Sequence, residues 1–196
     1  MKLFLVRHTT LDIAPNICYG QSDVAISENF EAERLQLQKK LLNLKFDAIY
    51  TSPLQRCQHL AEALCKDSSL GFANSDIKPD ARLKELHFGD WELCPWDAIP
   101  RDVFDTWAKD YANLAPPNGE TFSQLHSRAK SFVEEIASHS QEKHILVITH
   151  GGLIRALIAE VLQMPLKRLF RLSIDHASIT LLEFKDEVPK VHYMNL

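Results

Sequence analysis

The chain has 196 residues, of which 45% are apolar and 24% charged, and its formal net charge is −4. These values are ordinary for a globular protein, and the length fits one domain over residues 1–196. The negative balance offers no general attraction for nucleic acid or an anionic membrane, so we expect neither as a partner. A phosphate-bearing ligand would therefore need a local positive pocket.

Four cysteines are present, and none of them forms a CxxC pair. Their spacing indicates reduced thiols rather than a disulfide framework. No apolar run approaches the roughly 20 residues of a membrane-spanning helix. We therefore expect a cytoplasmic protein; a monomer and a homodimer both fit a chain of this size.

Apolar runs that predict strands alternate with patterns that predict helices. Strands are expected over residues 3–6, 46–50, 144–149, 177–184 and 191–194, with a weaker one near 72–77. Helices are expected over residues 32–44, 53–66, 122–136 and 153–162. This alternation predicts a three-layer α/β/α sandwich, a mostly parallel sheet with helices on both faces. Residues 87–118, rich in proline and aromatic residues, break the rhythm and are interpreted as an inserted lid.

Three of the predicted strands end in residues suited to phosphate chemistry. Arg7 and His8 follow the first strand, Arg56 comes just after the second, and His150 follows the third. Because ligands bind beyond the carboxyl ends of parallel strands, we expect these side chains to meet. Arginine forks match phosphate oxygens, and a protonated His150 would add charge.

The local sequence at the second and third junctions supports this arrangement. Ser52 is a good N-cap, and Gln55 would complete a capping box, which places Arg56 in the first helical turn. Gly151 and Gly152 open the next helix and would leave backbone N–H groups bare for an anion.

Phosphoryl transfer needs a nucleophile, cationic donors and a proton for the leaving group. His8 can act as nucleophile if its other ring nitrogen donates to a backbone carbonyl. Glu85 is our choice as proton donor, with Asp90 and Glu92 left open as alternatives. This scheme requires no metal and no cofactor. His176, just before a predicted strand, is a further candidate for ligand contact, and Arg128 is expected to pair internally.

Taken together, these segments resemble the histidine phosphatase superfamily, also called phosphoglycerate mutase-like. The resemblance rests on five blocks in the family's order: Leu5-Val6-Arg7-His8, Ser52-Pro53-Leu54-Gln55-Arg56, residues 83–92, residues 117–121, and residues 147–152. It implies a three-layer α/β fold, His8 as phosphate acceptor, Glu85 as proton donor, and a phosphate pocket of Arg7, Arg56, His150 and Gly151. The family usually has glycine where this chain has Thr9, whose hydroxyl is a candidate phosphate contact.

Within the family, Arg7-His8-Thr9 followed by residues 18–23 resembles the α-ribazole phosphatases of cobalamin assembly. This likeness implies a small phosphate ester as substrate, α-ribazole 5'-phosphate or its cobamide form, and makes Tyr19 and Gln21 candidate substrate contacts. The predicted lid adds a stacking surface for an aromatic base: Phe88, Trp91, Trp96, Phe104, Trp107 and Tyr111. The alternatives are a phosphoglycerate mutase or broad-specificity phosphatase, and a non-catalytic phosphoester-binding module.

Overall fold

The computed structural model describes residues 1–66, 70–71, 73, 76–138, 143–185 and 188–196. Its strands form one sheet in the order β3-β2-β4-β1-β5-β6. Their bounds are β1 (Lys2–Arg7), β2 (Ala48–Thr51), β3 (Ile77–Pro79), β4 (His144–Thr149), β5 (Ile179–Glu183) and β6 (Lys190–Tyr193). The weak strand expected near 72–77 begins only at Ile77, and residues 72, 74 and 75 of that range lie outside the described residues.

The mostly parallel sheet predicted from the sequence is confirmed. Strands β1, β2, β3 and β4 run parallel, whereas β5 pairs antiparallel with β1 and β6 antiparallel with β5. The carboxyl ends of β1, β2 and β4 therefore lie at one edge. The amino end of β5 reaches the same edge, because Val6 of β1 is opposite Ile179.

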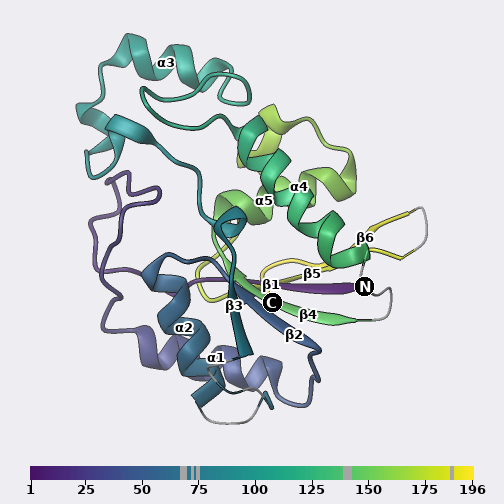
Figure 1. The fold of residues 1–196 in the computed structure, drawn as a ribbon. Helices are drawn as coiled ribbons and strands as arrows, with labels where there is room; N and C mark the ends of the chain where they lie inside the picture. Colours follow the sequence, from purple (N-terminus) through teal and green to yellow (C-terminus); the bar gives the residue numbers. More distant parts are fainter. Residues whose placement is uncertain (67–69, 72, 74–75, 139–142, 186–187) are drawn as a thin grey trace.

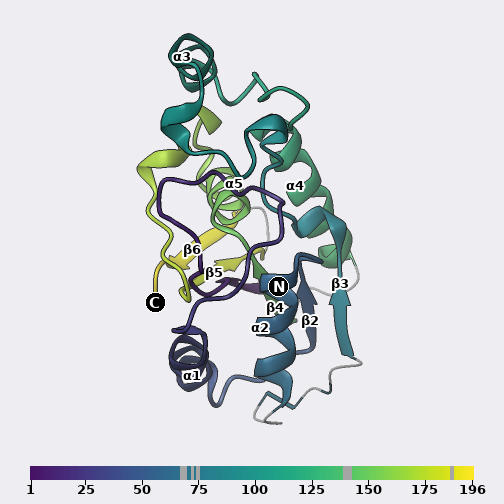
Figure 2. The same ribbon diagram turned by 90° about the vertical axis from the view of Figure 1, so that its left-hand side faces the viewer.

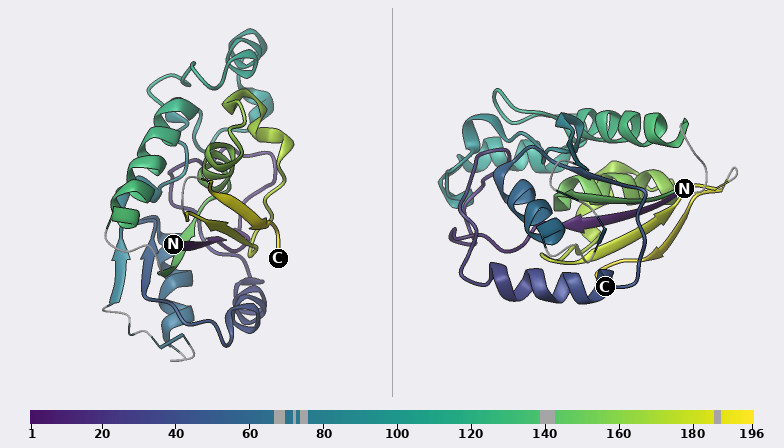
Figure 3. Two further views of the ribbon diagram at one scale, coloured as in Figure 1. Left: turned by 90° about the vertical axis from the view of Figure 1, so that its right-hand side faces the viewer. Right: turned by 60° about the horizontal axis from the view of Figure 1, so that its bottom comes forward.

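Helices cover both faces of the sheet, as expected (Figures 1 and 3). Helices α1 (Phe30–Leu41) and α2 (Gln55–Lys66) lie on one face, and α4 (Phe122–Ser138) and α5 (Gly151–Leu162) lie on the other. Alternate residues of β1 serve the two cores: Leu3 and Leu5 pack with α4 and α5, while Phe4 and Val6 pack with α1 and α2. All four helices were predicted, although α1 ends three residues before the expected Leu44.

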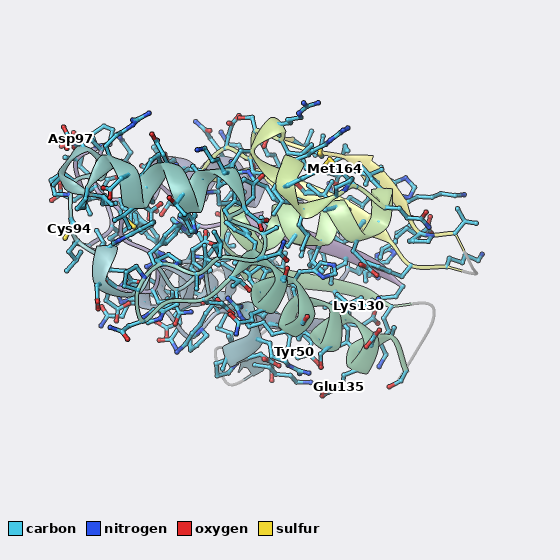
Figure 4. The ribbon with its side chains drawn as sticks, turned by 90° about the horizontal axis from the view of Figure 1, so that it is seen from above. Tyr50, Cys94, Asp97, Lys130, Glu135 and Met164 are labelled. Atoms are coloured by element: carbon cyan, nitrogen blue, oxygen red, sulfur yellow. The ribbon has the colours of Figure 1, made fainter. Side chains whose placement is uncertain are left out.

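The segment between residues 87 and 118 holds the short helix α3 (Arg101–Lys109), which lies above α5 and well away from the sheet (Figures 1 and 2). Seen from above, Cys94 and Asp97 of this segment lie at one end of the molecule, away from Lys130 and Glu135 of α4 (Figure 4). The chain returns to its starting point: Asp90 N–H donates to the Pro117 carbonyl at 2.9 Å, and Glu120 N–H donates to the His87 carbonyl at 2.8 Å. Among the described helices, none has the length and apolar character needed to cross a bilayer.

Candidate active site

His8 lies immediately after β1 and is almost completely buried, with 1% of its surface exposed. Its Nδ1–H donates to the Thr9 carbonyl at 2.7 Å, which assigns the free lone pair to Nε2. Burial, and then the positive charges of Arg56 and Arg7, hold the pKa of His8 well below its usual value. The ring is therefore a neutral imidazole surrounded by cations, which is the state that nucleophilic attack requires.

Arg7, the last residue of β1, points to the segment that precedes β5. Its Nη1 donates to the Ile174 carbonyl at 2.5 Å, and its Nη2 donates to Nε2 of His176 at 2.8 Å. Its Nε is buried, and the described residues offer it no acceptor. A buried donor without a partner is rare in folded proteins, so this atom marks a place where an anion would be stabilised.

Arg56 lies in the first turn of α2 and is fully buried. Its Nη1 and Nη2 donate to the carbonyls of Ser22 and Gly20 at 2.9 and 2.6 Å, and its guanidinium lies 5.3 Å from the Tyr19 ring. The loop of residues 19–23 is thus held directly against this cation. Arg56 lies close enough to His8 for its charge to lower the pKa of that ring, although 48 positions separate them in the chain.

The expected capping box at the start of α2 takes another form. Ser52 Oγ accepts from the Leu54 amide at 3.3 Å, while the Gln55 amide donates to the carboxylate of Asp23 at 3.1 Å. Asp23 therefore accepts from the Gln55 amide in place of Ser52, and the Ser52 amide, which the Gln55 side chain would meet in a capping box, donates instead to the Ile148 carbonyl at 2.9 Å. The bond between Asp23 and the Gln55 amide joins the 19–23 loop to α2 a second time.

His150 follows β4, and its ring centroid lies 5.2 Å from that of His8. Arg56 Nε donates to its Nδ1 at 3.3 Å, and its Nε2–H donates to Ser52 Oγ at 2.8 Å. Burial and the charge of Arg56 hold the pKa of His150 well below its usual value. The expectation of a protonated His150 is therefore wrong for this state: both ring nitrogens have partners that suit the neutral form.

The Glu85 side chain binds a backbone amide in the first turn of α5. Its Oε2 accepts from the Gly152 amide at 3.0 Å, and its Oε1 accepts from the Leu86 amide at 2.9 Å. A Cβ atom on residue 152 would overlap the carboxylate, so glycine is required there for this approach. The Gly152 amide, which was expected to be bare, thus donates to Glu85. This bond holds the carboxylate at Gly152, which follows His150 by two positions in the chain.

The two alternative acids have other partners. Glu92 accepts from the amides of Gln21 and Ser22 and from the Ser22 hydroxyl, which joins the 19–23 loop to the start of the 87–118 segment. Asp90 is exposed and accepts from Asn118. These contacts leave Glu85 as the carboxylate placed at the helix start.

Arg128 of α4 pairs internally, as predicted. Its guanidinium binds Glu120 at 2.7 Å and donates to the carbonyls of Arg82, Lys84 and Glu85. It therefore fixes the backbone on which Glu85 stands.

Three further residues that were predicted to contact the ligand, His176, Thr9 and Gln21, differ in where they lie. The His176 ring lies 5.2 Å from that of His8, and burial next to Arg7 lowers its pKa to about 4. Thr9 is fully buried, and its hydroxyl has no partner among the described residues. Gln21 Nε2 donates to the Glu85 carbonyl at 2.9 Å, so this side chain supports the carboxylate segment.

Sequence reasoning missed Arg155. It lies one helical turn after Gly151 on α5, and its Nη1 is 3.1 Å from the position that a Cβ atom on Gly151 would occupy, next to Arg7 Nε at 3.2 Å. The i, i+4 spacing from Gly151 was the available signal, because it places both residues on one helix face. Cys57 is buried, its Sγ lies 3.5 Å from His150 Nε2, and burial raises the pKa of its thiol.

The chain is similar to known phosphatases along its whole length. The chain is 26% identical to the adenosylcobalamin/alpha-ribazole phosphatase of Escherichia coli K12 over 100% of this chain and 96% of that protein. It is 24% identical to phosphoserine phosphatase 1 of Hydrogenobacter thermophilus over 100% and 92% of the two chains. A solved mycobacterial glucosyl-3-phosphoglycerate phosphatase with VO3 superposes with a TM-score of 0.86 at 26% identity, covering 99% and 98%. The family model "Histidine phosphatase superfamily (branch 1)" matches residues 3–196, and the chain belongs to that superfamily.

Proposed function

We propose that this protein hydrolyses a small phosphate monoester through a phosphohistidine on His8. The observation that carries the proposal is the hydrogen bond from His8 Nδ1 to the Thr9 carbonyl, which directs a neutral Nε2 lone pair into a cluster of Arg7, Arg56 and His150. A neutral nucleophile beside two guanidinium groups is the arrangement that phosphoryl transfer favours.

The reaction then has two balanced steps. His8 Nε2 attacks phosphorus, the bond from phosphorus to the ester oxygen breaks, and the Glu85 carboxyl gives its proton to that oxygen as the alcohol leaves. Water next attacks phosphorus, the P–N bond breaks, and the Glu85 carboxylate takes the water proton. Inorganic phosphate leaves, and both side chains regain their starting states.

The positions of the cations support the same roles. Arg7 Nε is buried without an acceptor among the described residues, and Arg155 lies beside it. A phosphate oxygen placed there would satisfy the orphaned donor and separate the two positive charges. In this proposal Arg7, Arg56, His150 and the Gly151 backbone hold the phosphoryl group, while Thr9, Tyr19, Gln21 and His176 line its surroundings.

For the substrate we propose α-ribazole 5'-phosphate or its cobamide form, in a cytoplasmic step of cobalamin assembly. Two features favour it: the likeness to the Escherichia coli phosphatase along the whole chain, and the aromatic side chains in residues 87–118, which we propose act as a lid over the single domain. A second candidate is a substrate with a carboxylate, such as phosphoserine or phosphoglycerate. Arg155 favours that candidate, because a cation beside the phosphate pocket could also bind a carboxylate.

The mechanism is tested by incubating wild-type protein and the His8→Ala variant with a ³²P-labelled ester, followed by quenching in base. Wild type should retain an acid-labile label, and the variant should retain none and show no turnover. Retained activity in the variant would overturn the mechanism. A variant that still binds phosphate while wild type hydrolyses nothing would favour the non-catalytic binding module.

A substrate panel then decides between the two candidates. We expect higher kcat/KM for α-ribazole 5'-phosphate than for phosphoserine or 3-phosphoglycerate. The opposite order would support the carboxylate-bearing substrates and leave the phosphohistidine chemistry intact.

A further inference from the structure

The His176 ring lies against two residues of the proposed phosphate pocket. His176 belongs to the segment between the short helix Leu166–Arg171 and β5, and its ring centroid lies 5.2 Å from that of His8. Its Nε2 accepts from Arg7 Nη2 at 2.8 Å, and within the described part of the chain the ring makes no other hydrogen bond. The contact with Arg7 is therefore the polar interaction on which a role for this side chain depends.

The backbone next to His176 is paired with the residues that follow β1. The Arg7 amide donates to the Ser178 carbonyl at 3.1 Å, and the Ala177 amide donates to the His8 carbonyl at 3.2 Å. Ala177 has a φ of +50°, a backbone conformation that residues with a Cβ atom seldom adopt. The backbone therefore keeps residue 176 beside His8 by its own hydrogen bonds, so a change of the side chain tests the side-chain contacts alone.

The preceding residues of the same segment are fixed as well. Arg155 Nε donates to the Leu172 carbonyl at 2.8 Å, and the Asp175 amide donates to Asn195 Oδ1 at 2.9 Å. Asn195 Nδ2 in turn donates to the Ser173 carbonyl at 2.9 Å. The acceptor for Arg7 is thus in place before a ligand arrives, and no ordering of this segment opposes ligand binding.

The hydrogen bond requires a neutral His176 ring, because an imidazolium has no lone pair with which to accept. Burial, and then the charge of Arg7, lower the pKa of His176 to about 4, while Asp175 raises it and Arg56 lowers it further. At pH 7 the ring proton is therefore on Nδ1, and the Nε2 lone pair accepts from Arg7.

This segment fixes two of the three nitrogens of the Arg7 guanidinium. Nη1 donates to the Ile174 carbonyl and Nη2 to His176, whereas Nε is buried and has no acceptor among the described residues. Because a guanidinium is planar, holding both Nη atoms also sets the direction of the Nε–H bond. A donor oriented in advance stabilises an anion without the cost of reorganisation.

We propose that His176 is a positioning residue for phosphoryl transfer: its Nε2 holds Arg7 Nη2, so that Arg7 Nε points at an oxygen of the phosphoryl group bound at His8. This role rests on the proposed phosphatase function, since it concerns the same phosphate pocket. His176 acts through Arg7 and gives no proton to the leaving group, because the nitrogen that meets Arg7 is an acceptor.

The kinetic test measures hydrolysis of p-nitrophenyl phosphate by His176→Gln, His176→Asn and His176→Leu. A glutamine amide reaches the position of Nε2, an asparagine amide reaches that of Nδ1, and leucine offers neither. We expect kcat/KM to fall about 10- to 100-fold in His176→Leu and His176→Asn, the factor that corresponds to losing a hydrogen bond of a charged group. In His176→Gln it should stay within about threefold of wild type, since the amide oxygen can accept from Arg7.

The matched control is His126→Leu. His126 is a partly buried histidine of α4 whose Nε2 bonds to Glu160 at 2.8 Å. Glu160 follows Gly151 by nine positions on α5, about 14 Å along the helix, so this variant should keep the activity of wild type. A loss in His126→Leu equal to that in His176→Leu would overturn the proposal.

Three further outcomes would also overturn the positioning role. The first is recovery of activity in His176→Asn but not in His176→Gln, which would indicate a donor at Nδ1. The second is an equal loss in His176→Gln and His176→Leu. The third is a loss that is large for alkyl phosphates and small for p-nitrophenyl phosphate, which would indicate proton donation to the leaving group.

Calorimetric binding of inorganic phosphate separates this role from the proposed function. The Kd should rise about tenfold or more in His176→Leu and stay near the wild-type value in His176→Gln and His126→Leu. The same order of Kd values in a protein that hydrolyses no ester would refute the proposed function and support the contact between His176 and Arg7. Equal Kd values in wild type and His176→Leu would overturn the positioning role even where wild type hydrolyses the ester.

Discussion

The Nδ1 atom of His8 donates to the carbonyl of the next residue, Thr9, at 2.7 Å. A contact between neighbours in the chain fixes the ring without help from a distant side chain, so the tautomer is set as soon as the strand end is formed. The threonine that replaces the family's usual glycine keeps this carbonyl, which explains how the substitution can be accommodated.

This relationship leads to a prediction about the protonation of His8. Burial and the neighbouring arginines lower its pKa, so the ring should stay neutral through pH 6. An NMR titration of the histidine Cε1 protons, with the His8 signal assigned by its loss in His8→Asn, should show its inflection well below 6.5. An inflection at or above 6.5 would contradict the described environment.

Folding stability should depend on pH for the same reason. His8, His150 and His176 all have lowered pKa values in the folded state, so the unfolded chain binds more protons below pH 6.5. Stability is then fully present above pH 6.5 and falls as pH decreases toward the folded pKa values, by up to about 1.4 kcal/mol per pH unit for each histidine. Urea unfolding at pH 7, 6 and 5 measures this decline, and His176→Gln should make it shallower. A constant free energy of unfolding over that range would disprove it.

The Glu85→Gln variant should lose activity in proportion to how poor the leaving group is. We expect a loss of about 100-fold or more for alkyl phosphates, the usual scale of general acid catalysis, and a much smaller loss for p-nitrophenyl phosphate. The measurement is kcat/KM for both esters with wild type and variant. The same loss for both would exclude Glu85 as the acid.

Gly152→Ala should imitate the Glu85 variant without unfolding the protein. Alanine suits a helix better than glycine, but its methyl group would overlap the Glu85 carboxylate and displace it. Kinetics of the single variants and of the double variant form a cycle in which Gly152→Ala adds little once Glu85 is glutamine. Additive losses would show that the two residues act separately.

Ser52→Ala should weaken the site through His150. The change removes the oxygen acceptor of the His150 Nε2–H, leaves that buried donor only the weak acceptor Cys57 Sγ, and removes the cap on the Leu54 amide, which together cost about 1–3 kcal/mol. We expect a similar loss in the free energy of unfolding and a lower kcat. Ser127→Ala, in which the exposed hydroxyl bonds to the Ser123 carbonyl of its own helix, serves as the control for the loss of a serine hydroxyl. Unchanged kcat in Ser52→Ala would show that the His150 contact has no positioning role.

The sequence predicted the parts of the site that depend on local order. Arg7, His8, Arg56 and His150 follow apolar strands, and parallel strands bring their ends together, so these positions could be read directly. The protonation of His150 could not, because it depends on Ser52 and Arg56, which reach the ring only in the folded chain. Ser52 caps the start of α2 as predicted, but the capping box with Gln55 was wrong for the same reason, since Asp23 arrives from a separate loop.

The antiparallel direction of β5 also could not be predicted from the pattern of apolar residues. Apolar runs show that a strand exists but not which way it runs, and this direction is what brings His176 to the edge that holds His8. Arg155 was missed because it is embedded in an apolar helix and has no motif of its own.

The two ends of segment 90–117 are bonded to each other, so changes inside this segment differ in their consequences from changes in the phosphate site. The paired backbones at His87–Glu120 and Asp90–Pro117, with Glu92 and Arg128 on either side, hold both ends of this segment whatever its interior contains. Glu92 and residues 93–96 also bind the 16–22 loop that holds Arg56, so the part of the segment after Trp96 is the part that can be exchanged without loosening the phosphate site. The substrate preference can thus change through replacement of part of this segment, while the residues that transfer the phosphoryl group stay the same.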